Sequence, residues 1–214
     1  VDTVLFDLDG TLSHSESGIL GSLRHALTTE GIDVPTYEIL RTAIGPPFRT
    51  GLPDIGVPLD RVEDVRRTYK THYAAGGLLN TSLFPGIETL LVDLRKAEMR
   101  LAVATSKPES DAEQVVAHLG IAEHFDVVAG SDEASGRDDK AKVITSALQR
   151  LGVDPGPHVV MVGDRHHDID GARANGIETI AVGWGYGSPE EHSAYGALAI
   201  APTADDLGRL LLAS

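Results

Sequence analysis

The sequence predicts an α/β fold: a doubly wound, Rossmann-like parallel sheet with an all-helical cap domain inserted into it. Short runs rich in Val, Ile, Leu and Ala alternate with stretches of helical periodicity along most of the chain. Continuous apolar runs are typical of strands buried on both faces, and the periodic stretches between them are typical of crossover helices. One long stretch after the first run has helical periodicity and no convincing strand, and this interruption predicts the insertion.

Six runs are expected as strands because they are short and apolar and most are followed by Gly or a polar residue. They are residues 4–6, 101–104, 125–129, 159–162, 179–182 and 198–200. Four crossover helices are expected from a period of 3.6 residues. They are residues 87–97, 111–119, 141–151 and 204–212.

The insertion is expected to be a helical cap domain. Five apolar residues make one helical face: Ile19, Leu20, Leu23, Ala26 and Leu27. Gly31 is expected to end this helix, and residues 61–75 predict another one. We therefore expect a cap domain at residues 15–82 and a core domain formed by residues 1–14 and 83–214.

Composition and charge restrict the function classes. The 214 residues are 42% hydrophobic and 23% charged, as expected for an ordinary folded soluble protein, and the lack of Cys excludes disulfides, thiolate zinc sites and thiol nucleophiles. Lys+Arg 18 against Asp+Glu 32 gives a net charge of −14, which disfavours nucleic acid and anionic membranes as partners. No apolar run is long enough for a membrane span, and Val1 and Asp2 lack the order of a signal peptide. We expect a cytoplasmic protein, a monomer or homodimer, whose missing first Met indicates trimming.

The first chemical signal is a pair of carboxylates directly after the first strand, in the run Asp7-Leu8-Asp9-Gly10-Thr11. Ligands of open parallel sheets bind beyond the carboxyl ends of the strands, so both carboxylates should reach the ligand crevice. A divalent cation can relieve their repulsion by binding one, while the other works as acid and then base. The alternatives are two solvated loop aspartates or a calcium loop. Calcium is disfavoured because Gly10 is fourth rather than sixth and a strand precedes the motif.

Two further signals are expected near this pair. Thr105 and Ser106 end a strand, where hydroxyl and backbone N–H groups can hold a phosphate oxygen, although such residues are also common in turns and helix caps. Lys140 and Lys142 stand at the start of a predicted helix, where one lysine can bring a fixed positive charge to Asp7. The alternative for the lysines is a solvated helix start with acidic N-cap residues.

The fourth signal is a second strand followed by acidic residues. Asp164 and Asp168 are one helical turn apart and can face one magnesium ion, which prefers a few carboxylates together with waters and substrate oxygens. His166 and His167 suggest zinc, but adjacent side chains rarely converge on one ion and no third ligand is evident. Residues 183–187 read GxGxG without the GxxG continuation, which disfavours dinucleotide binding, and no GxxxxGK[ST] run exists.

Taken in order, these motifs resemble those of the haloacid dehalogenase (HAD) superfamily, and specifically its phosphatases with a C1-type helical cap after the first strand. The phosphoglycolate phosphatase group is the most similar within it. Three runs carry that resemblance: Ile44-Gly45-Pro46-Pro47, Phe84-Pro85-Gly86, which also marks the return hinge, and Gly185-Tyr186-Gly187-Ser188.

The resemblance implies a role for each catalytic candidate. Asp7 would attack phosphorus to give an aspartyl phosphate, and Asp9 would protonate the leaving alcohol and then activate water. Thr105 would bind the phosphoryl oxygens, and Lys140 would steady Asp7 and the transferred group. Lys140 is preferred to Lys142 because the family's lysine precedes the paired apolar residues of the helix at this distance.

The resemblance also implies a Mg²⁺ site and contacts to the substrate. Asp7, Asp164 and the main-chain carbonyl of Asp9 would bind the cation, with Asp168 as an outer or second ligand. Substrate and phosphate contacts are expected from Gly10, Ser106 and Arg49.

The expected function is therefore a Mg²⁺-dependent phosphatase that acts on a small phosphorylated metabolite resembling phosphoglycolate. Dehalogenases lack the second acid, Asp9, and phosphonoacetaldehyde hydrolases use an early cap lysine, whereas this cap holds only Lys70. The first alternative is a phosphotransferase, either a sugar-phosphate mutase or an enzyme like the HAD-fold tyrosine kinases that residues 101–107 and 160–187 resemble. The second is a phosphometabolite-binding module without turnover, which intact catalytic motifs disfavour.

Overall fold

The computed structural model of the chain describes residues 1–46 and 48–213. The chain divides into two compact units, one formed by Val1–His14 and Leu83–Ser214 and the other by Ser15–Ser82. These are the bounds of the predicted domains, and the roles of the units as catalytic core and substrate-selecting cap stay predictions. Among the described residues, every helix is too short or too polar to cross a bilayer.

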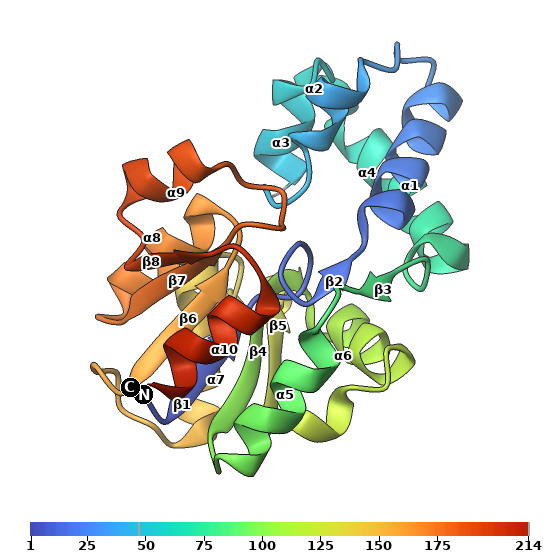
Figure 1. The fold of residues 1–214 in the computed structure, drawn as a ribbon. Helices are drawn as coiled ribbons and strands as arrows, with labels where there is room; N and C mark the ends of the chain where they lie inside the picture. The colour runs from blue at the N-terminus through green and yellow to red at the C-terminus, as the bar shows by residue number, and fades with distance from the viewer. Residues whose placement is uncertain (47, 214) are drawn as a thin grey trace. The chain divides into compact units, whose positions relative to one another are not determined.

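The first unit contains a six-stranded sheet whose order is β5-β4-β1-β6-β7-β8, with all neighbouring strands parallel (Figure 1). Its strands are β1 (Thr3–Phe6), β4 (Arg100–Pro108), β5 (Val127–Ser131), β6 (Val159–Gly163), β7 (Glu178–Val182) and β8 (Ala199–Ala201). Every residue of β1 and β6 is buried, which explains the continuous apolar runs in their sequences. The predicted fold class is confirmed.

Helices connect and cover these strands. They are α5 (Ile87–Lys96), α6 (Glu109–His118), α7 (Lys140–Leu151), α8 (His166–Ala174), α9 (Pro189–Tyr195) and α10 (Ala204–Leu212), with short 3₁₀ turns at Ala122–His124 and Glu133–Ser135. Side chains of α7 and α8 share one buried cluster with alternate residues of β1, β4 and β6, among them Leu5, Ala102 and Met161. In Figure 1, α5 and α10 lie side by side in front of the sheet, and the two helices are in contact.

Some element predictions were wrong in their bounds or missed an element. Phe125 lies before β5 because a 3₁₀ turn precedes that strand, and β4 continues beyond the predicted residue 104 to Pro108. The last strand is shifted by one residue, to Ala199–Ala201. Periodicity did not predict α8 or α9, because both helices are short and largely polar and therefore lack a strong apolar stripe.

The parallel arrangement brings separate chain segments to one edge of the sheet. β1 lies between β4 and β6, so the residues that follow these three strands emerge at neighbouring positions. Asp7 follows β1, Thr105 lies in the last part of β4, and Asp164 follows β6. The sheet order itself therefore gathers three of the predicted motifs.

The second unit is helical among its described residues. It contains α1 (Glu16–Thr29), α2 (Tyr37–Arg41), α3 (Phe48–Asp54), the 3₁₀ turn Leu59–Arg61, α4 (Val62–His72) and the π-helical turn Tyr73–Gly77. The apolar face of α1 is buried as predicted except for Ile19, which is half-buried, and Gly31 has the expected positive φ of 69°. Pro47 lies outside the described residues. Short strands β2 (Ser13–His14) and β3 (Ser82–Leu83) pair where the chain leaves and re-enters the first unit.

Glycines allow α1 to pack closely on the π-helical turn. A Cβ atom on Gly18 would overlap the carbonyl oxygen of Gly77, and one on Gly77 would overlap the hydroxyl of Ser22. Gly21 lies on the same helix, and a Cβ there would have no neighbour within 4 Å. Backbone atoms cannot yield as a flexible side chain can, so this contact requires glycine.

Gly18→Ala should destabilise the protein by about 1–3 kcal/mol, because α1 must move away from the π-helical turn. Gly21→Ala is the matched control and should stabilise it by about 0.5–1 kcal/mol, because alanine loses less backbone entropy in an open helical position. Urea unfolding of both variants measures the difference, and similar stabilities would show that the close packing does not constrain α1.

Candidate active site

Asp7 and Lys140 form the centre of the site. Asp7 follows β1, and its backbone N–H donates to the carbonyl of Val162 at 2.9 Å, which fixes it against β6. Lys140, the first residue of α7, donates from Nζ to Oδ1 of Asp7 at 2.8 Å and to the carbonyl of Ala104 at 3.0 Å. Its Nζ also lies 2.7 Å from Oδ1 of Asp168. One buried ammonium group thus joins the end of β1, the middle of β4 and the helix after β6.

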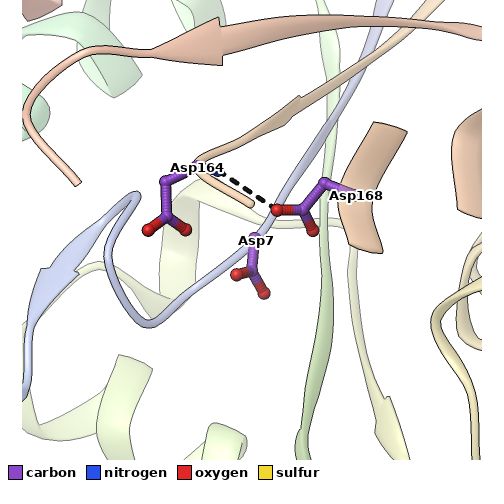
Figure 2. A group of neighbouring side chains, drawn as sticks. All are labelled: Asp7, Asp164 and Asp168. Carbon is purple, nitrogen blue, oxygen red and sulfur yellow. Dashed lines mark hydrogen bonds between the residues drawn. The ribbon is translucent and has the colours of Figure 1, made fainter. Parts of the chain in front are cut away.

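Asp164 and Asp168 complete a group of three buried aspartates (Figure 2). Oδ2 of Asp168 accepts hydrogen bonds from the backbone N–H groups of Asp164, at 3.1 Å, and Arg165, at 3.0 Å. Oδ2 of Asp164 accepts a hydrogen bond from the backbone N–H of Tyr186 at 2.7 Å, and its Oδ1 accepts one from the Thr11 hydroxyl at 3.4 Å. One carboxylate oxygen from each aspartate lies within 4.8 Å of the other two.

Burial makes the ionised form of these carboxylates unfavourable. Burial, opposed by Lys140, raises the pKa of Asp7 from 3.8 to about 6. Burial and the charges of Asp168 and Asp7 raise the pKa of Asp164 well above its usual value. Burial also disfavours the charge of Lys140, but Asp168 and Asp7 outweigh this effect and raise its pKa. Three buried carboxylates against one ammonium group leave excess negative charge, and a hard cation such as Mg²⁺ fits these oxygen donors.

Asp9 lies beside a lysine that the sequence interpretation did not single out. Nζ of Lys107 lies 3.0 Å from Oδ2 of Asp9, and the lysine side chain is 5% exposed. Thr105 and Lys107 are both buried, whereas Ser106 between them is exposed. Alternation along the extended chain was the signal that could have found Lys107, because residues two apart share a side.

Other predicted site residues lie in different surroundings. Gly10 has a φ of 90°, and a Cβ atom there would overlap the carboxylate of Asp164, so this position requires glycine. Lys142 is exposed and pairs with Asp138 at 2.6 Å, which leaves Lys140 as the lysine beside Asp7. Arg49 is exposed on α3 in the second unit.

Helix α9 anchors the loop that carries Asp164, and the sequence interpretation missed this. Oε1 of Glu191 accepts hydrogen bonds from Nε of Arg165 at 3.1 Å and from the backbone N–H of His166 at 2.8 Å. The buried His192 donates from Nε2 to the carbonyl of Asp164 at 2.7 Å. Glu191 also binds the ring of His166 at 2.7 Å. Among the described residues, the group that could hold a metal ion consists of Asp7, Asp164 and Asp168.

The family model described as "Haloacid dehalogenase-like hydrolase" matches residues 4–182. Tyrosine-protein kinase PtkA of Mycobacterium tuberculosis is 47% identical over 184 residues, which cover 86% of this chain but 62% of that protein. The 5'-nucleotidase of Pseudomonas aeruginosa is 36% identical, covering 90% of this chain and 87% of that one. Phosphoglycolate phosphatase of Rhodospirillum rubrum is 30% identical, covering 96% and 88%. The chain thus spans about three fifths of the length of the mycobacterial kinases it matches.

The fold also matches solved structures. The crystal structure of a predicted phosphatase from Clostridium acetobutylicum has a TM-score of 0.93 and 33% sequence identity, and the match covers 100% of this chain and 99% of that one. The described arrangement of strands and helices is therefore shared with a solved relative over nearly its whole length.

Asp7→Asn should stabilise the metal-free protein at about pH 8, where the buried carboxylate of the wild type is ionised. The pKa of Asp7 is raised from 3.8 to about 6, so the folded state binds this proton at a higher pH than the unfolded chain does. Wild-type stability therefore falls as the pH rises through this window, and the advantage of Asn should shrink toward zero as the pH falls below about 4.

Urea unfolding in the presence of a chelator, from about pH 4 to pH 8, measures this difference. Asp33→Asn, at an exposed aspartate of the second unit, serves as the control. A gain that is the same at every pH would show that burial of the Asp7 charge does not limit stability.

Proposed function

Because the chain belongs to the haloacid dehalogenase-like hydrolase family, we propose that it is a Mg²⁺-dependent phosphatase acting on a small phosphomonoester through an aspartyl phosphate. The observation that carries this proposal is the buried Asp7 carboxylate, held by Lys140 at 2.8 Å beside two further buried aspartates. A carboxylate that is fixed on one oxygen can use the other as a nucleophile.

In the first step, the carboxylate of Asp7 attacks phosphorus. The bond between phosphorus and the alcohol oxygen breaks as Asp9, in its protonated form, gives its proton to that oxygen. Thr105, the backbone N–H of Ser106 and the loop at Gly10 bind the phosphoryl oxygens, and the ammonium of Lys140 balances the charge on Asp7 and the transferred group.

In the second step, the ionised Asp9 takes a proton from a water molecule. The water oxygen attacks phosphorus, and the bond from phosphorus to Asp7 breaks, which releases inorganic phosphate and restores the nucleophile. Both steps use the same two carboxylates, so the reaction consumes only the ester and water.

Asp7, Asp164 and the main-chain carbonyl of Asp9 would hold Mg²⁺. When bound, the cation neutralises the excess negative charge of the carboxylates and of the phosphoryl oxygens. Asp168 acts as an outer group, because two N–H donors already occupy its Oδ2 and Lys140 lies on its Oδ1.

The substrate proposed is a small anionic metabolite resembling phosphoglycolate, and the site of action proposed is the cytoplasm, with the protein a monomer or homodimer. The relatives named as phosphoglycolate phosphatase and 5'-nucleotidase, both matched over most of their length, support this substrate class. The 47% identity to PtkA supports a second candidate, transfer of phosphate to a tyrosine hydroxyl. An aspartyl phosphate can pass its phosphoryl group to hydroxyls other than water.

Wild-type protein with Mg²⁺ should release phosphate from p-nitrophenyl phosphate and from small alkyl phosphomonoesters, and a chelator should abolish this release. Asp7→Asn should show no turnover, because the amide cannot form the aspartyl phosphate. A malachite-green assay for phosphate measures both effects. Magnesium-dependent turnover that survives in Asp7→Asn would contradict the covalent mechanism.

The same preparations distinguish hydrolysis from phosphotransfer. Incubation with γ-labelled ATP and a tyrosine-containing peptide should leave the peptide unlabelled if the protein is a phosphatase. Labelled peptide, with no phosphate released from the esters, would establish the second candidate instead.

Arg49→Ala should lower kcat/KM for an anionic substrate such as phosphoglycolate by about ten- to a hundredfold. We propose that Arg49 binds the substrate carboxylate, because the family resemblance implies a substrate contact from this part of the cap and a protein with a net charge of −14 needs a local cation for an anionic substrate. Such a contact is typically worth about 1.5–3 kcal/mol.

The matched readout is p-nitrophenyl phosphate, which lacks the carboxylate and should be hydrolysed by Arg49→Ala at nearly the wild-type rate. Arg67→Ala, at an exposed arginine on α4, controls for loss of surface charge. An equal loss on both substrates would indicate that Arg49 supports folding instead of substrate selection.

A further inference from the structure

We propose that Lys107 is a positioning residue that holds Asp9 by one carboxylate oxygen and thereby reserves the other oxygen for proton transfer. This inference rests on the function proposed above, in which Asp9 acts as acid and then as base. It assigns a role to a residue outside the predicted site.

The two oxygens of Asp9 have different surroundings. Oδ2 lies 3.0 Å from Nζ of Lys107, whereas Oδ1 is buried and has no hydrogen-bond partner among the described residues. A buried carboxylate oxygen without a partner is costly, so its presence needs an explanation, and a catalytic role is one such explanation. The contact therefore fixes the side chain through Oδ2 and leaves Oδ1 as the oxygen that can meet a reacting group.

Both ends of the contact are attached to firmly held backbone. The N–H groups of Thr11, Leu12 and Ser13 all donate to the carbonyl of Leu8, which folds the loop tightly around Asp9. On the other side, the N–H of Lys107 donates to the hydroxyl of Thr105 at 3.2 Å within β4. Because neither backbone is free to drift, a single ion pair can set the direction of the Asp9 carboxylate.

The burial of Lys107 shows that this contact is more than a surface ion pair. The lysine side chain is 5% exposed and that of Asp9 is 17% exposed. Removing an ammonium group from water is unfavourable unless it gains close partners, so a lysine is retained at such a position only where its charge is compensated.

Each aspartate of the Asp7-Leu8-Asp9 run forms an ion pair with a different buried lysine. Lys140 pairs with Asp7 and Lys107 pairs with Asp9, at 2.8 Å and 3.0 Å. The nucleophile and the acid–base group, which would repel each other as anions, are thus held by separate cations. Lys107 keeps its proton throughout: the proton that moves travels between Oδ1 of Asp9 and the alcohol oxygen or water.

The test compares Lys107→Met, Asp9→Asn and the double variant in the intact chain, with Lys142→Met at an exposed lysine as the control. Kinetics use glycerol phosphate, whose alkoxide leaving group needs a proton, with saturating Mg²⁺. We expect Lys107→Met to lower kcat by about tenfold or more while KM changes less than about twofold. In the Asp9→Asn background, the same substitution should cause no further loss, because the two residues act as one unit.

The comparison of Asp9→Asn with the double variant tests the proposal even if Lys107→Met alone folds poorly. The double variant lacks both charges, so it leaves no buried charge without its partner. A further drop in kcat in the double variant, or a raised KM in that background, would overturn the proposal and show that Lys107 acts on the substrate or on folding. Wild-type kcat in Lys107→Met would overturn it as well. If the wild type hydrolyses no phosphomonoester, the proposed function fails, and this inference fails with it.

Discussion

The ion pairs of Lys140 are the interaction on which the rest of the site depends. A single buried ammonium group contacts Asp7, Asp168 and the carbonyl of Ala104, and thus joins the residue after β1, helix α8 and strand β4. Without it, adjacent buried carboxylates would repel one another in an environment where charges are weakly screened. Removal of Lys140 would leave the buried aspartates without a compensating charge, so this one lysine constrains Asp7, the start of α7 and β4 together.

The site is also held from outside the catalytic motifs. Glu191 and His192 of α9 bind three consecutive residues after β6, which are Asp164, Arg165 and His166. Asp168 accepts hydrogen bonds from the backbone N–H groups of Asp164 and Arg165. Gly10 permits the loop after β1 to approach the carboxylate of Asp164. In the proposed function, these contacts fix the direction of the side chains before the substrate binds, which preorganises the site.

Much of the architecture was predictable because its signals are local. Continuous apolar runs located the six strands of the larger sheet to within a few residues, although not the short pair β2 and β3, and the helical period located α5, α6, α7 and α10. Helices α8 and α9 were missed because polar residues with site contacts, such as Asp168 and His192, occupy positions where an apolar stripe would otherwise appear. A helix whose polar side chains contact the site has a weaker periodic pattern of apolar residues than a helix that only covers the sheet.

The sequence by itself determined the fold class, the carboxylates at the ends of β1 and β6, and the resemblance that connects them, because each depends on residue type and order along the chain. Only the tertiary structure decided which polar side chains meet. It placed Lys140 rather than Lys142 on Asp7, turned Lys107 inward and Ser106 outward, and brought Glu191 and His192 of α9 against the loop that carries Asp164. The physical reason is that most of these contacts join residues far apart in the chain. Strand order, local register and burial decide which residues meet, and the local composition of a segment does not indicate any of the three.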